Sequence, residues 1–191
     1  MKISEVKSAF KVADIVLDKD HKVRKIKFIF LDKIKDKNNK PIDKGILKDN
    51  SGRIYFFVSN KKIMKIGKSK CKGGIKNTMN FYQGGMQGGP SIRTFGIHIL
   101  LKEELESGKR VEVYMMICKK SKMFVEGLFG EEKIYVTPDV LDVEFKCKND
   151  YKEKIGKYPP WNFQENGVSW RKDILRMHGQ HNSGRKVFFN K

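Results

Sequence analysis

The first quarter of the chain alternates apolar segments with strongly polar ones. Residues 1–18 have a short helical rhythm. Residues 23–31 (VRKIKFIFL) alternate basic and apolar side chains before a continuous apolar run, which predicts a strand. The next stretch is rich in Lys, Asp and Asn and is typical of an exposed loop or hairpin tip. We therefore expect residues 1–48 to be an N-terminal extension attached to a main domain.

The main domain is expected at residues 49–162, and it opens with a hairpin. A turn signal at 49–52 precedes the segment RIYFFV (53–58), which is rich in β-branched and aromatic residues, and the alternating segment KIMKIG (62–67). The polar link between these two segments is short enough for a hairpin turn. We expect two paired antiparallel strands.

The elements expected after this hairpin alternate between helices and strands. Gly, Lys and Asn dominate 70–90, with a short helix possible at 75–82, and helical spacing of apolar residues predicts a helix over 91–108. A buried strand is predicted at 109–118 and a hairpin or loop at 119–138.

The last predicted helix spans 139–155 and ends at Gly156, before the chain break at Pro159-Pro160. The segment 163–191 is polar and basic with little periodicity, so we expect a basic C-terminal extension. The order strand–strand–helix–strand–helix predicts an α+β fold, with a small antiparallel sheet flanked by helices.

The charge of the chain indicates a polyanionic partner. Its 191 residues are 39% hydrophobic, which suits one folded domain, and 41 Lys and Arg against 22 Asp and Glu give a net charge of +19. Nucleic acid is the usual polyanion, because cationic side chains release the counterions condensed on its phosphates. A solvated basic surface without such a partner is the alternative.

Two other features bear on location and redox chemistry. The chain has no apolar run approaching the roughly 18 residues of a membrane-spanning helix. Its amino terminus lacks the apolar core and cleavage site of a signal peptide, so we expect a cytoplasmic protein that does not bind membranes. Cys71, Cys118 and Cys147 are odd in number and widely spaced, which indicates neither a disulfide framework nor a zinc knuckle.

The predicted hairpin carries side chains that suit phosphodiester chemistry. Cleavage needs an activated nucleophile and stabilisation of the charge that develops on the phosphate, and a metal ion on a carboxylate can supply the latter. Tyr55 lies on the first strand and Lys65 on the second, just before Gly67-Lys68-Ser69, where backbone amides can approach a phosphate. Taken alone, Tyr55 and Lys65 are more simply a half-buried sheet aromatic and a solvated edge lysine.

The hairpin as a whole resembles the first motif of the GIY-YIG nuclease superfamily. Gly52-Arg53-Ile54-Tyr55 matches its Gly-Ile-Tyr strand with one extra residue, and Lys65-Ile66-Gly67 matches its Tyr-Ile-Gly strand with Lys in place of Tyr. Some type II restriction endonucleases of the family carry the same Lys-Ile-Gly variant. The resemblance implies that Tyr55 activates the nucleophile and that Lys65 assists it in activating water.

The family also places an arginine on the helix after the hairpin. Arg93 is the preferred candidate because a forked guanidinium holds a phosphate bidentately, and Lys76 is the competing cation. His98 follows five residues after Arg93 as a further catalytic candidate. The simpler interpretations are a capping or surface cation for Arg93 and a buried polar residue for His98.

The final family elements are a metal-binding glutamate and a supporting asparagine. Glu144, near the start of the last helix, and Asn162, after Pro159-Pro160-Trp161, match them, so the resemblance covers 52–162. It implies that Glu144 holds one Mg²⁺ or Mn²⁺, an ion that keeps several waters and needs few protein ligands. Glu153 is the rival carboxylate, and a glutamate at a helix start is also stabilised by the helix dipole.

The resemblance implies a metal-dependent endonuclease, specifically a type II restriction enzyme that cuts double-stranded DNA at defined sites. Cutting both strands of a palindrome implies a homodimer, and such an enzyme works beside a DNA methyltransferase of matching specificity. Residues 1–48 would contact DNA or the second subunit. A non-cleaving DNA-binding protein with this fold, or a homing or repair nuclease, is the alternative. The expected DNA contacts are Lys68, Ser69, Lys76, Trp170, Arg171, Lys172, Arg176, His178, Arg185 and Lys186.

Overall fold

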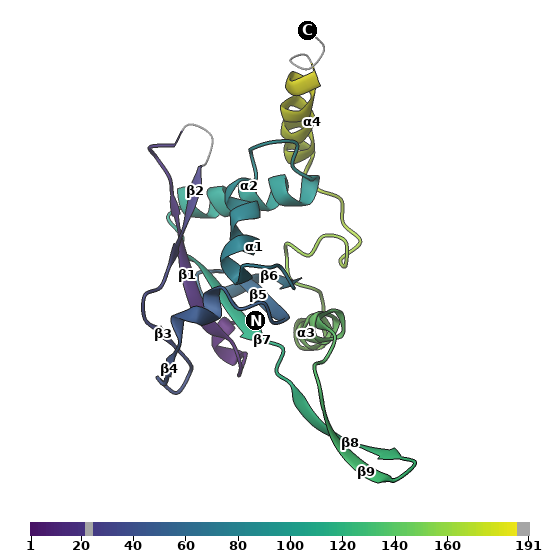
Figure 1. Cartoon of the computed structure of the whole chain (residues 1–191). Helices are drawn as coiled ribbons and strands as arrows, with labels where there is room; N and C mark the ends of the chain where they lie inside the picture. Colours follow the sequence, from purple (N-terminus) through teal and green to yellow (C-terminus); the bar gives the residue numbers. More distant parts are fainter. Residues whose placement is uncertain (22–24, 187–191) are drawn as a thin grey trace.

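A five-stranded antiparallel sheet runs through the computed structural model, which describes residues 1–21 and 25–186, with side chains as far as Ser183 (Figure 1). Every neighbouring pair in the sheet is antiparallel. The α+β class predicted from the sequence is confirmed. In spatial order the strands are β2 (Ile26–Phe30), β1 (Phe10–Leu17), β7 (Val111–Ile117), β5 (Arg53–Ser59) and β6 (Lys62–Ser69).

Strand β5, which lies between β7 and β6, contributes side chains to both hydrophobic cores. All seven of its residues are buried, so both faces of the strand are covered, which explains why residues 54–58 form an apolar run instead of alternating. Tyr55 and Phe57 face the core that contains helices α1 (Gly74–Gln83) and α2 (Ile92–Glu106). Ile54, Phe56 and Val58 face a second core, which is covered by helix α3 (Val140–Ile155).

The predicted hairpin of β5 and β6 is confirmed. Asn60 and Lys61 make its turn with φ angles of 43° and 67°, the left-handed conformation that two-residue hairpin turns require. The register sets Tyr55 opposite Gly67 and Phe57 opposite Lys65. Directly opposed residues project to the same face of a sheet, so Tyr55, Lys65 and Gly67 share one face.

The N-terminal segment differs from expectation in two ways. Residues 10–17 form strand β1 instead of a helix, because β1 pairs with a strand on each side and buries Val12, Ala13 and Ile15. Pairing with β7 also makes β1 and β2 part of the central sheet, so 1–48 is more than an appended segment.

Short elements complete the N-terminal segment. These elements are the 3₁₀ helices η1 (Ile3–Glu5) and η2 (Lys44–Leu47) and the strands β3 (Ile34–Lys35) and β4 (Pro41–Ile42). The expected loop or hairpin after β2 is present as a small two-stranded ribbon of β3 and β4, and a 3₁₀ helix separates it from β5.

The predicted helices are present and have identifiable caps. Ser91 Oγ accepts a hydrogen bond from Thr94 N (3.2 Å) at the start of α2. Asp139 Oδ1 accepts one from Leu141 N (2.8 Å) at the start of α3, which ends at Gly156 with φ 83°. Since α3 begins at Val140, Glu144 lies in its second turn. The sequence had placed Glu144 at the start of the helix, and this position is wrong by about one turn.

Helix α4 (Lys172–Lys186) was missed by the sequence, which shows little periodicity there. It packs on α2 through the buried Ile174 and through His178 and His181, whose rings lie 5.3 and 5.6 Å from the ring of Phe95. The Nε2 atoms of these histidines lie 2.8 Å from Pro90 O and 3.1 Å from Gly88 O. The two histidines therefore dock the helix.

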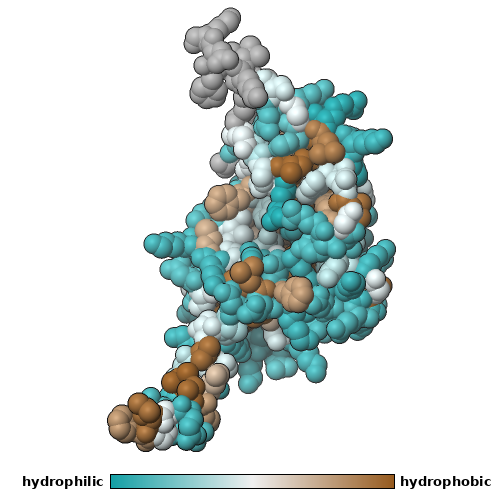
Figure 2. Space-filling model, turned by 90° about the vertical axis from the view of Figure 1, so that its right-hand side faces the viewer, coloured by the Kyte–Doolittle hydropathy of each residue, from teal (hydrophilic) through white to brown (hydrophobic). Residues whose placement is uncertain are grey.

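A two-stranded hairpin of β8 (Ser121–Gly127) and β9 (Gly130–Val136) projects away from the body, as predicted for 119–138 (Figure 1). All of its residues are exposed, and hydrophobic side chains gather on its outer part (Figure 2). Among the described residues, no helix has the length and apolar character needed to cross a membrane.

Candidate active site

A cavity of about 350 Å³ opens where β6, α2, α3 and the segment after α3 meet. It gathers side chains that are far apart in the sequence. Its lining includes Tyr55, Lys65, Gly67, Lys68, Tyr82, Arg93, Glu144, Lys148, Trp161, Asn162, Phe163, Gln164, Glu165 and Trp170. Five predicted catalytic residues, Tyr55, Lys65, Arg93, Glu144 and Asn162, are among them.

Tyr55 and Gly67 depend on each other sterically. A Cβ at Gly67 would lie 2.4 Å from both Cζ and Oη of Tyr55, so only glycine leaves room for the ring. The Tyr55 hydroxyl is 2.7 Å from the hydroxyl of Tyr82 on α1. Burial, and next the neighbouring Tyr82, raise the pKa of Tyr55 well above its ordinary range, so the phenol keeps its proton near neutral pH.

Tyr82 is a site residue that sequence reasoning missed. It lies on the buried face of α1 with Ile75 and Met79, at helical spacing that indicates only a core position. Burial raises its pKa as well. Its contact with Tyr55 depends on how α1 is placed over the sheet, which local sequence does not give.

Lys65 is a buried amine in the cavity wall. Its side chain is only 7% exposed, and it forms no salt bridge with any residue that the structure describes. Burial, and then the positive charge of Arg93, lower the pKa of Lys65 to about 8. A substantial share of Lys65 is therefore neutral at mildly alkaline pH and can accept a proton.

Glu144 belongs to a cluster of alternating charges. Its Oε1 lies 2.8 Å from Lys148 Nζ, and its Oε2 lies 3.7 Å from Lys68 Nζ. Lys148 also forms an ion pair with Glu165. Sequence reasoning did not single out Lys148 or Glu165, although Lys148 is four residues after Glu144, the spacing of neighbours on a helix face. The rival Glu153 is exposed and lies outside this cavity.

Asn162 fixes the strand that carries Lys65 and Gly67. Its buried amide accepts a hydrogen bond from Ile66 N (2.9 Å) and donates one to Ile66 O (3.0 Å). The backbone N–H of Trp161 also donates to Met64 O (2.8 Å). The segment after α3 thus continues the hydrogen bonding at the edge of β6, and Asn162 is a positioning residue.

The structure brings Arg93 to the cavity and leaves Lys76 outside it. Arg93 is exposed in the first turn of α2, and its Nη2 donates to Gln164 on the opposite wall. Lys76 projects instead to the ring of Phe30 on β2, with Nζ 5.4 Å from the ring centroid. Of the two candidate cations, only Arg93 faces the other site residues.

His98 lies in the core and does not reach the cavity. Its ring is completely buried, and Nδ1 lies 2.8 Å from the backbone oxygen of Tyr82. Burial lowers the pKa of His98, which favours the neutral ring. The structure therefore corrects the expectation of a catalytic His98, whose contact links α2 to the end of α1.

Some of the expected DNA-contacting side chains are exposed, and others already have partners within the protein. Lys172 and Arg176 are exposed one turn apart on α4, and Lys68 borders the cavity. The buried Ser69 hydroxyl lies 2.7 Å from that of Thr78, so it cannot contact DNA as expected without breaking this bond. Arg171 pairs with Glu103 and Asp173.

Other members of the expected DNA-binding set make structural contacts or lie outside the described side chains. Trp170 packs against Phe163, with ring centroids 4.3 Å apart, and a Cβ on Gly96 would lie 2.2 Å from its ring. The side chains of Arg185 and Lys186 lie outside the described residues.

The residues around Glu144 fit a water-rich divalent ion. In the part of the chain that the structure describes, no three His, Cys, Asp or Glu side chains gather as a metal cage. Glu144 nevertheless presents a carboxylate to the cavity, and the ammonium of Lys68 lies 3.7 Å from its Oε2, beyond hydrogen-bonding distance. A single carboxylate with room for water suits Mg²⁺, which commonly takes one or two protein carboxylates.

Comparisons with known proteins identify similar structures but no similar sequence family. No protein-family model matches the chain, and no curated protein matches it. A mutant of EndoII from bacteriophage T4 is similar in structure, with 19% identity and a TM-score of 0.48 over 85% of this chain and 98% of that one. The restriction endonuclease Hpy188I in complex with product DNA is also similar, with 21% identity and a TM-score of 0.45 over 83% and 84%.

Proposed function

We propose that this protein is a DNA endonuclease of the GIY-YIG type that hydrolyses phosphodiester bonds with one divalent metal ion. The observation that carries the proposal is the common cavity of Tyr55, Lys65, Arg93 and Glu144. Their positions on a hairpin and two later helices follow the order of the family motifs.

The side chains divide the chemical work according to their ionisation. Lys65, with its pKa near 8, takes up the proton of the attacking water. Tyr55 retains its own proton and orients that water through its hydroxyl. Arg93 offers a forked guanidinium at the cavity mouth to the phosphate oxygens.

Glu144 is the residue that would hold Mg²⁺ or Mn²⁺. A divalent ion bound there supplies positive charge against the charge that develops on the phosphate and the leaving oxygen. Lys148 has a second carboxylate partner in Glu165, so its ammonium stays paired when Glu144 takes another ligand. The cavity is lined by four basic residues, Lys65, Lys68, Arg93 and Lys148, against the two carboxylates of Glu144 and Glu165, and this excess of positive charge attracts phosphate.

The proposed substrate is double-stranded DNA, and the proposed role is that of a type II restriction enzyme. The net charge of +19 and the exposed Lys172 and Arg176 support binding of the duplex. We propose a homodimer, so that two cavities act on the two strands of a palindrome, and a cytoplasmic location beside a DNA methyltransferase of matching specificity.

A non-cleaving DNA-binding protein is the second candidate. It is favoured by the ion pair of Glu144 with Lys148, which already balances the carboxylate, and by Lys65 in place of the second family tyrosine. Such a protein would bind DNA in a salt-sensitive way and leave it intact.

Digestion of a panel of plasmids and a phage-sized DNA with Mg²⁺ tests the proposal. Discrete fragments with one common end sequence are expected, and sequencing the ends gives the site and stagger. Intact DNA across the whole panel, together with tight binding in a mobility-shift assay, would instead identify the non-cleaving protein.

A further inference from the structure

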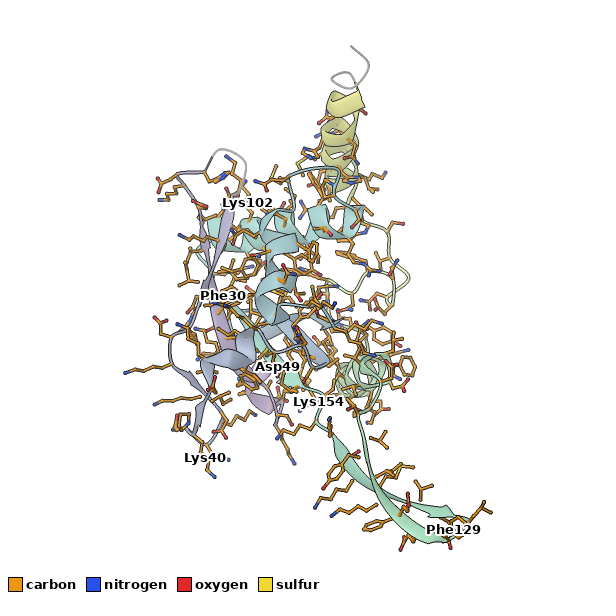
Figure 3. The ribbon with its side chains drawn as sticks, in the orientation of Figure 1. Phe30, Lys40, Asp49, Lys102, Phe129 and Lys154 are labelled. Carbon is orange, nitrogen blue, oxygen red and sulfur yellow. The ribbon has the colours of Figure 1, made fainter. Side chains whose placement is uncertain are left out.

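The hairpin of β8 and β9, residues 121–136, forms an arm that leaves the body between β7 and α3 (Figure 1). Phe129 is at its tip (Figure 3), and both Leu128 and Phe129 are completely exposed. An isolated two-stranded hairpin is at best marginally stable in water, because it has no second layer on which to bury its apolar side chains. The arm therefore needs a surface to pack on.

One face of the arm is apolar along most of its length. Met123 stands opposite Ile134, and Ser121 stands opposite Val136. Opposed residues share a face, and side chains alternate along each strand, so Met123, Val125, Ile134 and Val136 lie together, with Glu132 opposite Val125 at the outer end of the same face. Each of these four is at least 36% exposed. An exposed apolar patch of this kind marks an interaction surface.

The charges of the arm change sign from root to tip. Its root carries Lys119, Lys120 and Lys122, and its tip is flanked by Glu126, Glu131 and Glu132. Glu126 stands directly opposite Glu131, a like-charge pair that destabilises a hairpin. Within the described residues neither glutamate forms an ion pair. An acidic tip also repels phosphates, so DNA is a poor partner for it.

An apolar groove of about 770 Å³ lies at the root of the arm. Phe10, Ile46 and Met116 contribute to its lining, and its charged residues are Lys7, Lys37 and Lys119 with the single carboxylate of Asp36. The groove therefore combines an apolar floor with cationic residues. Such a groove is complementary to an apolar tip that is flanked by glutamates.

We propose that two copies of this chain exchange arms, with the tip of each arm in the root groove of the other copy. The pattern of basic root and acidic tip is complementary to itself when two arms run antiparallel, as an isologous twofold contact requires. Burying the Leu128–Phe129 tip and the apolar face of each arm in both copies would remove on the order of 1,000 Å² from water, enough for a specific interface.

This inference names the surface of the homodimer in the proposed function and needs no cleavage for its test. Sedimentation velocity on the full chain is expected to show a dimer for wild type and a monomer for the Leu128→Ser/Phe129→Ser double variant. The dissociation constant should rise roughly 100-fold, since such anchors carry most of the energy of an interface. Both substituted side chains are completely exposed, so the circular dichroism spectrum should not change. Phe81→Ser, which removes an exposed aromatic from α1, is the matched control and should stay dimeric.

A charge exchange tests the antiparallel pairing itself. A tip variant (Glu126→Lys/Glu131→Lys) and a root variant (Lys119→Glu/Lys120→Glu) should each be monomeric alone, because each repels its own copy. Mixed together, they should form a heterodimer in which both tip–root contacts are attractive.

Three outcomes would overturn the proposal. The first is a wild type that stays monomeric at micromolar concentrations, and the second is a mixture of tip and root variants that does not associate. The third is a Leu128→Ser/Phe129→Ser variant that loses DNA affinity with its oligomeric state unchanged, which would assign the tip to DNA.

Discussion

At the scale of single residues, the site depends on a steric fit between Tyr55 and Gly67. A Cβ at position 67 would overlap the Tyr55 ring, so Gly67→Ala should destabilise the protein by about 1–3 kcal/mol and reduce cleavage strongly. Chemical denaturation and a DNA cleavage assay measure the two effects. Gly89→Ala is the control, because no atom lies within 4 Å of the added methyl group. Equal effects of the two substitutions would contradict the fit.

The buried Lys65 predicts a characteristic dependence on pH. If its neutral form accepts the proton, the cleavage rate should rise with pH below about 8 and level off above it, since the pKa of Lys65 is about 8. Lys65→Arg cannot lose its proton and should be inactive at every pH. A rate that is flat from acidic to alkaline pH would contradict the role of Lys65.

The same group links stability to pH. Its pKa is about 8 in the folded chain and 10.5 ordinarily, so between these values the unfolded chain binds more protons. Stability should therefore rise with pH across that window, and the penalty for burying the ammonium should be complete below it. Denaturation of wild type and Lys65→Met at several pH values measures this difference. Lys65→Met should lack the rise.

The sequence predicted the motif residues of the site, but not the residues that contact them in the fold. Tyr55, Lys65, Arg93 and Glu144 follow a recognisable order along the chain, and the structure gathers them in one cavity. Tyr82 carried no such signal, because its hydroxyl meets Tyr55 only through the placement of α1 on the sheet. His98 and Ser69 looked functional by residue type, but burial assigns them internal contacts.

At the scale of elements, Asn162 couples the segment after α3 to β6. Asn162→Ala would leave the N–H and C=O of Ile66 without their amide partner, at a cost of about 2–3 kcal/mol, and would loosen the strand that holds Lys65. Thermal unfolding and the cleavage rate should both fall. Asn80→Ala, on the exposed face of α1, should change neither. Full activity of Asn162→Ala would show that β6 holds its position without this contact.

The elements that the sequence missed are those decided by tertiary contacts. The segment of β1 has a weak helical rhythm, but pairing with β2 and β7 on both sides overrides it. Helix α4 has few apolar positions, and its docking on α2 also uses His178 and His181, which hydrogen-bond to backbone oxygens. Such contacts leave no hydrophobic periodicity in the sequence. Strands with uninterrupted apolar runs and helices with clear caps were predictable because their signals lie in the local sequence.

At the scale of the whole molecule, the net charge of +19 predicts steep salt dependence of DNA binding. Affinity should fall by roughly 1,000-fold between about 50 and 200 mM salt if six or more phosphates are contacted. The double variant Lys172→Ala/Arg176→Ala should lower the slope of log affinity against log salt by about 2, since both cations are exposed. Arg171→Ala should leave the slope unchanged, because Glu103 and Asp173 already pair with Arg171. An equal loss from Arg171→Ala would contradict this assignment.

If the cavity cuts DNA with a metal ion held by Glu144, removing this carboxylate should abolish cleavage and spare DNA binding. Cleavage of a single-site DNA is measured under single-turnover conditions with Mg²⁺ for wild type, Glu144→Gln and Glu153→Gln, with DNA binding measured in parallel. Both variants remove one carboxylate from the same helix, and only Glu144 faces the cavity. We expect Glu144→Gln to bind DNA but to cut it at least roughly 1,000-fold more slowly, and Glu153→Gln to cut at the wild-type rate. Undiminished cleavage by Glu144→Gln, or an equal loss in both variants, would contradict it.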